Sequence, residues 1–181
     1  MPRLRVPTLD DLKPEQRVVW ARTLAGRRGA VPANVRVWLH SPELAGRAQA
    51  LGEFVRYSTT LSPRHTELAV LVVARRWSAQ YEWAVHAAEA VRAGVSEEVI
   101  AAVRERRAPA FTDATDRAVF DLTGALVTDG RVPDEVYRAA IADLGERAVV
   151  ELVGLVGYYT MVAFTLNTFE VPAPAGSPSL D

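Results

Sequence analysis

The chain has 181 residues, of which 49% are hydrophobic and 24% charged, and its formal net charge is -1. The high hydrophobic fraction and the low net charge exclude an intrinsically disordered chain. The near-neutral net charge also argues against a nucleic-acid partner. The sequence contains no cysteine, which excludes disulfides, thiolate nucleophiles, CxxC redox chemistry and cysteine-ligated metal sites.

The hydrophobic pattern is helical almost throughout, and no convincing alternating strand is present. Pro14 occupies a favourable first-turn position, and the pairs Ser41-Pro42 and Ser62-Pro63 are both typical helix starts. The helices predicted in the first half of the chain span 14–24, 34–39, 42–57, 63–77 and 79–93.

The second half continues in the same way. Gly94 predicts a helix end, Ser96 and Asp113 predict helix starts, and Gly130 marks a turn. The predicted helices span 97–106, 112–128, 133–144 and 146–169. We therefore expect one all-α domain of roughly eight helices over residues 1–171, followed by a Pro- and Ser-rich, loosely held tail at 172–181.

The most apolar segment, residues 148–169, invites comparison with a membrane span. Its apolar residues fall at helical spacing and are interrupted by Glu151 and Asn167, so a buried helix or an oligomer interface fits it better. The first sixteen residues are polar and lack the apolar stretch of a signal peptide. We expect a cytoplasmic protein with no membrane partner.

The segment from Glu67 to Glu89 holds the candidate acid–base residues. Glu82, His86 and Glu89 share one face of a predicted helix, where the carboxylates can hydrogen-bond the imidazole and tune its pKa. Glu67 lies at the start of the preceding, very apolar helix, where burial would raise its pKa towards the range of a general base. The alternative for Glu82 and His86 is an ordinary solvated pair.

Two further expectations concern the helix over 79–93. Val85, Ala88 and Val91 lie opposite the polar residues and are expected to pack inward. A metal site is not expected, because zincins place two histidines at this spacing and only His86 is present.

Three segments carry a resemblance to a known family. They are LSPRHTELAVLVVARRWSAQYEWAVHAAEAVRAGVSEEVI at 61–100, PANVRVWLHSPELA at 32–45 and VVELVGLVGYYTMVAFTLNTFEV at 149–171. Their order and spacing resemble the carboxymuconolactone decarboxylase family, which shares the helical alkyl hydroperoxidase D (AhpD) fold.

The resemblance implies roles for particular positions. His86 matches the histidine of the family's redox members, and Glu67 matches their proton-relay glutamate. Ala79 and Glu82 stand where those members carry the two cysteines of CxxC. A thiol peroxidase is thereby excluded, and the chain resembles the branch with an acid in place of the thiol.

The function that the resemblance implies is decarboxylation of a small carboxylated lactone or related acid without a cofactor. His86, Glu82 and Glu67 are the predicted acid–base residues. Substrate binding is expected from residues nearby in the sequence, with Arg64 as the first choice for a carboxylate clamp. These binding candidates are Arg64, Tyr81, Trp83, His40 and Arg36.

Other functions remain open on the sequence alone. The same residues could serve a proton-transfer isomerase, hydratase or cyclase, and a non-catalytic oligomeric binding protein would leave them scattered over the surface. A small-molecule substrate is the expected partner. A homo-oligomer, either a trimer or a hexamer, is also expected from the apolar last helix and from the resemblance.

Overall fold

The computed structural model describes residues 3–177, 179 and 180. Over these residues the fold is all-helical, as predicted, with one short 3-10 helix, nine α-helices and no strand. The elements are η1 (Leu9–Asp11), α1 (Pro14–Ala25), α2 (Ala33–Trp38), α3 (Pro42–Tyr57), α4 (Pro63–Arg76), α5 (Gln80–Arg92), α6 (Glu97–Arg104), α7 (Ala114–Asp129), α8 (Asp134–Leu144) and α9 (Glu146–Thr168).

The predicted helix starts at Ser41, Ser62, Ser96 and Asp113 are confirmed, and three of these four residues cap their helix with the side chain. Ser62 and Ser96 each accept a hydrogen bond from a backbone N–H three residues later, and Asp113 accepts two from the first turn of α7. Ser41 makes no such side-chain bond, although α3 begins at Pro42 as predicted; the Ser41 N–H donates to the Trp38 carbonyl.

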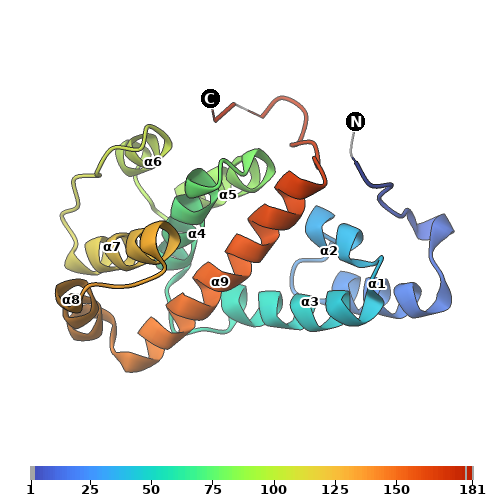
Figure 1. Cartoon of the computed structure of the whole chain (residues 1–181), viewed down its shortest axis with the longest axis horizontal. Helices are drawn as coiled ribbons and strands as arrows, with labels where there is room; N and C mark the ends of the chain where they lie inside the picture. The colour runs from blue at the N-terminus through green and yellow to red at the C-terminus, as the bar shows by residue number, and fades with distance from the viewer. Residues whose placement is uncertain (1–2, 178, 181) are drawn as a thin grey trace.

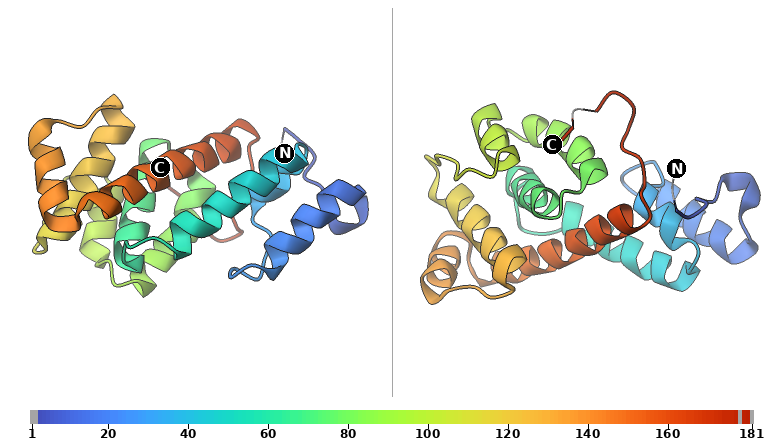
Figure 2. Two further views of the ribbon diagram at one scale, coloured as in Figure 1. Left: turned by 90° about the horizontal axis from the view of Figure 1, so that it is seen from below. Right: turned by 45° about the horizontal axis from the view of Figure 1, so that its top comes forward.

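Helix α4 is the centre of the fold. All nine residues from Thr66 to Ala74 are buried, since α4 packs against α5, α7 and α9. Figure 1 shows α9 crossing the molecule, with α1–α3 on one side of it and α6–α8 on the other, and the two views of Figure 2 agree. An apolar helix surrounded in this way cannot present a hydrophilic face.

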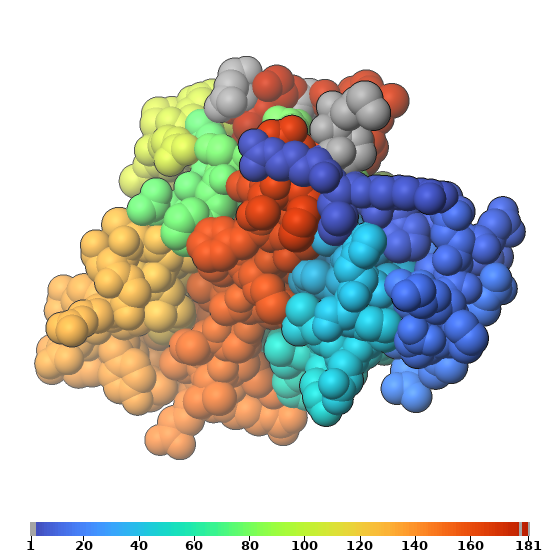
Figure 3. Space-filling model, turned by 45° about the vertical axis from the view of Figure 1, so that its right-hand side comes forward, coloured from blue at the N-terminus to red at the C-terminus, as the bar shows by residue number. Residues whose placement is uncertain are grey.

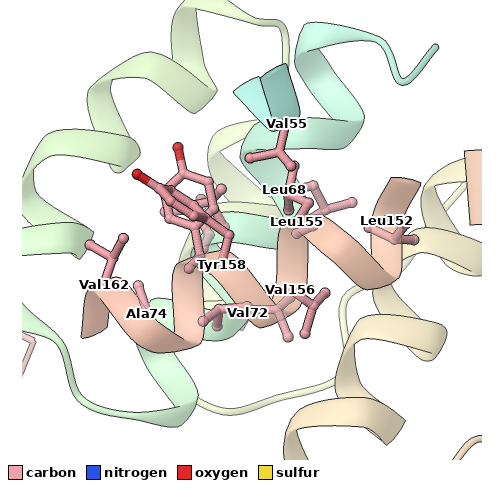
Figure 4. Close-up of a cluster of buried hydrophobic side chains, with 14 of the residues drawn as sticks. Val55, Leu68, Val72, Ala74, Leu152, Leu155, Val156, Tyr158 and Val162 are labelled. Atoms are coloured by element: carbon pink, nitrogen blue, oxygen red, sulfur yellow. The ribbon is translucent and has the colours of Figure 1, made fainter. Parts of the chain in front are cut away.

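Helix α9 is, by length and composition alone, apolar enough to cross a membrane, but 61% of its most apolar window is buried inside the protein. Val55 of α3, Leu68 of α4 and Leu155 of α9 meet in one cluster beside it (Figure 4). Figure 3 shows the rest of α9 as a strip at the surface, between α7–α8 and α2–α3. The helix therefore has a core face and an exposed face.

The tail is not loosely held at its described end, which corrects our expectation. Leu180 is 5% exposed and belongs to the core cluster. Its N–H donates to Gln80 Oε1 at 2.7 Å, and Arg104 donates to the Ser179 carbonyl. Apolar burial near an otherwise polar tail outweighs its Pro- and Ser-rich composition. Positions 1, 2, 178 and 181 of the predicted domain and tail lie outside the described residues.

Candidate active site

The crossing of α4 and α5 brings together two residues 19 positions apart. Glu67 lies in the first turns of α4 and His86 in the middle of α5, and His86 Nδ1 lies 2.6 Å from Glu67 Oε2. Both residues are buried, and the edge of the imidazole meets the Tyr159 ring at 5.1 Å between centroids. The scattered arrangement expected of a non-catalytic protein is not observed for this pair.

The surroundings of the pair set its protonation. Burial acts to raise the pKa of Glu67, but the hydrogen bond and charge of His86, together with Arg56, outweigh it and hold that pKa below its usual value. Burial lowers the pKa of His86, and Glu67 offsets only part of the effect. At neutral pH the arrangement is an ionised carboxylate accepting the Nδ1–H of a neutral imidazole, which leaves Nε2 with its lone pair.

Glu82 lies one helical turn before His86 and has a different environment. It is 1% exposed, and neither carboxyl oxygen has a hydrogen-bond partner among the described residues. Burial raises the pKa of Glu82 well above its usual value. An ionised carboxylate without a partner is very costly at such a position, so the group is held as a neutral acid.

Glu82 and His86 open onto the same cavity, whose volume is about 420 Å³. This cavity lies between α5, α9, the end of α3 and the loop between α1 and α2. Its charged and aromatic lining includes Arg28, Arg56, Tyr81, Glu82, His86, Glu89, Tyr158 and Tyr159. Cavities of a few hundred Å³ with a few convergent polar groups are typical of small-molecule sites.

A second hollow of about 370 Å³ is lined by both members of the ion pair between Arg56 and Glu67. Arg56 Nη2 and Glu67 Oε1 are 3.5 Å apart, and the Arg56 side chain is only 10% exposed. Arg56 lines both hollows, and Glu67 lines the second. The Glu67–His86 pair thus joins the two.

Of the residues predicted to bind substrate, only Tyr81 lines the cavity. Trp83, 3% exposed, is part of the hydrophobic core. His40 is exposed and its Nε2 contacts the Arg5 carbonyl, and Arg36 does not line the cavity either.

Arg64, the predicted carboxylate clamp, is also elsewhere. Its guanidinium makes a paired contact with the buried carboxylate of Asp116 and donates to the Gly94 carbonyl. Arg64 and Glu67 are three residues apart and so neighbours on one helix, but the bonds to Asp116 and Gly94 hold the Arg64 guanidinium away from the cavity.

The inward face of α5 differs from the one expected, and of the three apolar residues only Val85 is half-buried, in the cavity lining. Glu82 and His86 are buried, whereas Ala88 is exposed and Val91 is 49% exposed. The polar face turns inward because it meets α4 and α9 around a cavity rather than a closed apolar core.

Several lining residues were not identified from the sequence, among them Arg27, Arg28, Arg56, Tyr57, Tyr158 and Tyr159. The adjacent tyrosines are the one visible signal, since two hydroxyls in an apolar helix need polar surroundings. Nothing in the local pattern distinguishes Arg28 and Arg56 from the many other arginines. Within the described residues, no group of three or more His, Asp and Glu side chains is placed to hold a metal ion.

Comparison with known proteins finds a family whose model matches part of the chain. Residues 42–125 match the model of the carboxymuconolactone decarboxylase family, and no curated protein matches the chain. Three solved structures share the fold at identities too low to indicate more.

The first is an uncharacterised peroxidase-related protein from Silicibacter sp. TM1040, with a TM-score of 0.78, 16% identity and coverage of 99% of this chain and 96% of that one. The second, from Agrobacterium tumefaciens, has unknown function and is proposed as an antioxidant defence protein, AhpD; its TM-score is 0.68 at 21% identity, covering 76% and 95%. The third is a debrominase in complex with 2,3,4-tribromopyrrole, with a TM-score of 0.74 at 16% identity, covering 96% and 91%. Residues 42–125 thus match the carboxymuconolactone decarboxylase family, and the chain has an AhpD-like fold without the CxxC cysteines.

Proposed function

We propose that this protein is a cofactor-independent decarboxylase of a small, carboxylated, unsaturated ring such as a lactone acid. The observation that carries the proposal is the Glu82 carboxyl, which is buried and unpartnered beside a neutral His86 in a cavity of substrate size. A neutral carboxylic acid is a proton donor, and a neutral imidazole is an acceptor.

The reaction needs a proton donor more than a base. The bond from the ring carbon to the carboxylate breaks, CO₂ leaves, and the electron pair enters the adjacent unsaturated system as an enolate. Glu82 then gives its proton to carbon and regains one from solvent. Where the substrate carries a hydroxyl, His86 Nε2 accepts a hydrogen bond from it. The positive charge of Arg56 stabilises the developing enolate.

The comparisons support an enzyme of this general kind. A family named for a decarboxylase matches the segment that contains Glu67, Glu82 and His86. A fold neighbour, the debrominase, holds a small substituted ring in a solved complex. Because the chain has no cysteine, proton transfer replaces thiol chemistry as the basis of catalysis.

A panel of unsaturated lactone acids and heteroaromatic carboxylates, incubated with the protein in D₂O, tests the proposal. We expect CO₂ release and one deuterium at the carbon that loses the carboxylate. Glu82→Gln and His86→Gln should each reduce the rate about 10²- to 10⁴-fold, the range for general acid–base groups. The exposed Glu15→Gln is the matched control and should retain full activity.

Two results would redirect the proposal. Deuterium exchange or double-bond migration with the carboxylate retained would identify a proton-transfer isomerase that uses the same pair. Turnover unaffected by both Glu82→Gln and His86→Gln would remove the catalytic assignment altogether.

A further inference from the structure

Positive charge gathers at the cavity without a matching negative charge. Three guanidiniums line it, those of Arg27, Arg28 and Arg56. Of the carboxylates in the lining, Glu82 lies in an environment that keeps it neutral, and Glu89 forms an ion pair with Arg92. A concave site with excess positive charge favours anionic ligands.

Two of the three guanidiniums are engaged within the protein. Arg56 contacts the Glu67 carboxylate, and Arg27 donates to the Tyr57 carbonyl at 3.3 Å. Both also stack on the Tyr57 ring, with 5.2 Å from Arg27 and 5.4 Å from Arg56 to the ring centroid. Tyr57 therefore holds Arg27 and Arg56 in place through cation–π contacts.

Arg28 differs from both neighbours. Its side chain makes no hydrogen bond or ion pair with any described residue, yet it lines the cavity. Its charge lowers the pKa of Glu67 and of Tyr158, so it lies within electrostatic reach of the pair and of the α9 wall. The loop that carries it turns at Gly29, whose φ is 65°, a conformation that favours glycine.

We propose that Arg28 is the substrate-recognition residue of this cavity and that it binds the carboxylate of a small ring acid. The inference rests on the proposed function and adds the residue that selects an anionic substrate over its neutral analogue. A free guanidinium presents paired N–H donors that match the two oxygens of a carboxylate. Arg56, which is ion-paired with Glu67, has a different role: it stabilises the negative charge that develops on the substrate during the reaction.

Two probes of equal shape and different charge test this assignment. Pyrrole-2-carboxylate has a five-membered ring and one carboxylate, and pyrrole-2-carboxamide is its uncharged counterpart. Binding of both to the wild-type protein, Arg28→Gln, Arg28→Lys and Arg22→Gln is measured by calorimetry or ligand-observed NMR. Arg22 is exposed on α1 and does not line the cavity, so its variant reproduces the change in net charge alone.

We expect the wild-type protein to prefer the carboxylate and Arg28→Gln to lose about tenfold or more of that affinity, as for one charge-assisted hydrogen-bonded contact. Arg28→Lys should retain part of the affinity, and Arg22→Gln all of it. The weak binding of the carboxamide should be the same in every variant.

Equal binding of carboxylate and carboxamide by the wild-type protein, or binding of neither, would overturn the inference. So would an Arg28→Gln variant that binds the carboxylate as tightly as the wild type. These outcomes are independent of CO₂ release: a protein that binds the carboxylate through Arg28 but never decarboxylates it removes the proposed function alone. Conversely, Glu82→Gln could abolish turnover while Arg28→Gln leaves it unchanged. That result would overturn only the assignment of Arg28.

Discussion

Gly52 of α3 lies directly against the Tyr158 hydroxyl of α9. A Cβ atom on Gly52 would stand 2.1 Å from the Tyr158 oxygen and 2.5 Å from the ring carbon that bears it. No side chain fits there unless the tyrosine moves, and Tyr158 lines the cavity. The absent side chain therefore sets the position of one wall of the site.

Gly52→Ala should disturb that wall. Alanine normally stabilises a helix interior relative to glycine by about 0.5–1 kcal/mol. Here we expect a net loss of about 1–3 kcal/mol from overpacking, together with weaker binding of pyrrole-2-carboxylate. Gly124→Ala on α7, where an added Cβ meets nothing within 4 Å, is the control and should be neutral or stabilising. Urea unfolding of the two variants measures the difference, and equal stability would contradict the close contact.

Glu82 should make the protein less stable as pH rises. Its folded-state pKa is raised above the ordinary value of 4.5, so above that pH the native state keeps a proton that the unfolded chain loses. The free energy of unfolding then falls by up to about 1.4 kcal/mol per pH unit until the folded pKa is reached. In thermal unfolding between pH 5 and 9, the stability of Glu82→Gln relative to the wild type should increase as the pH increases. A constant difference would mean that Glu82 is ionised in the folded state.

Glu67 should tune the histidine, because its carboxylate offsets part of the effect of burial on His86. Glu67→Gln removes the charge but keeps an acceptor for the Nδ1–H, and it should lower the pKa of His86 further. The acid limb of the pH profile of kcat/KM should move to lower pH and the maximum should fall, by about 10- to 100-fold. NMR titration of the imidazole nitrogens checks the shift without a substrate, with Glu15→Gln as control. An unchanged pKa would show that the two groups are not coupled in solution.

The exposed face of α9 should bind other copies of the chain. Val150 is 72% exposed, Val153 45% and Phe164 48%, which is unusual for residues this apolar on one helix. We expect light scattering after size-exclusion chromatography to give a trimer or a hexamer, and Val150→Glu to reduce the mass. Leu24→Glu, at an exposed position on α1, should leave it unchanged. A wild-type mass of 19.8 kDa at micromolar concentration would contradict the expectation.

The helices were predictable because their signals are local. Ser62, Ser96 and Asp113 cap the helices that their positions indicate, and the apolar run in α4 predicts its burial. Likewise, the grouping of Glu82 and His86 follows from spacing on one helix. Glu67, on another helix, was singled out by its place at the start of an apolar helix, and the resemblance implied its pairing in function with His86.

The rest of the site depends on how helices cross, and no local pattern encodes that. Arg64 is near Glu67 in sequence but reaches Asp116 of α7, whereas Arg28 arrives from a loop and Arg56 from the end of α3. The inward face of α5 was misjudged for the same reason. Hydrophobicity alone favours Val91 inside, but the cavity requires polar groups there.

The anchored end of the chain bears on how the protein should be handled. The Leu180 N–H donates a hydrogen bond to the side chain of Gln80, the first residue of α5, and Glu82 follows two positions later. Truncation after residue 171, or a bulky affinity tag fused at the carboxyl end, would remove or disturb this contact with α5, the helix that carries Glu82. For measurements on this site, the purification tag belongs at the amino terminus and the last ten residues should be kept.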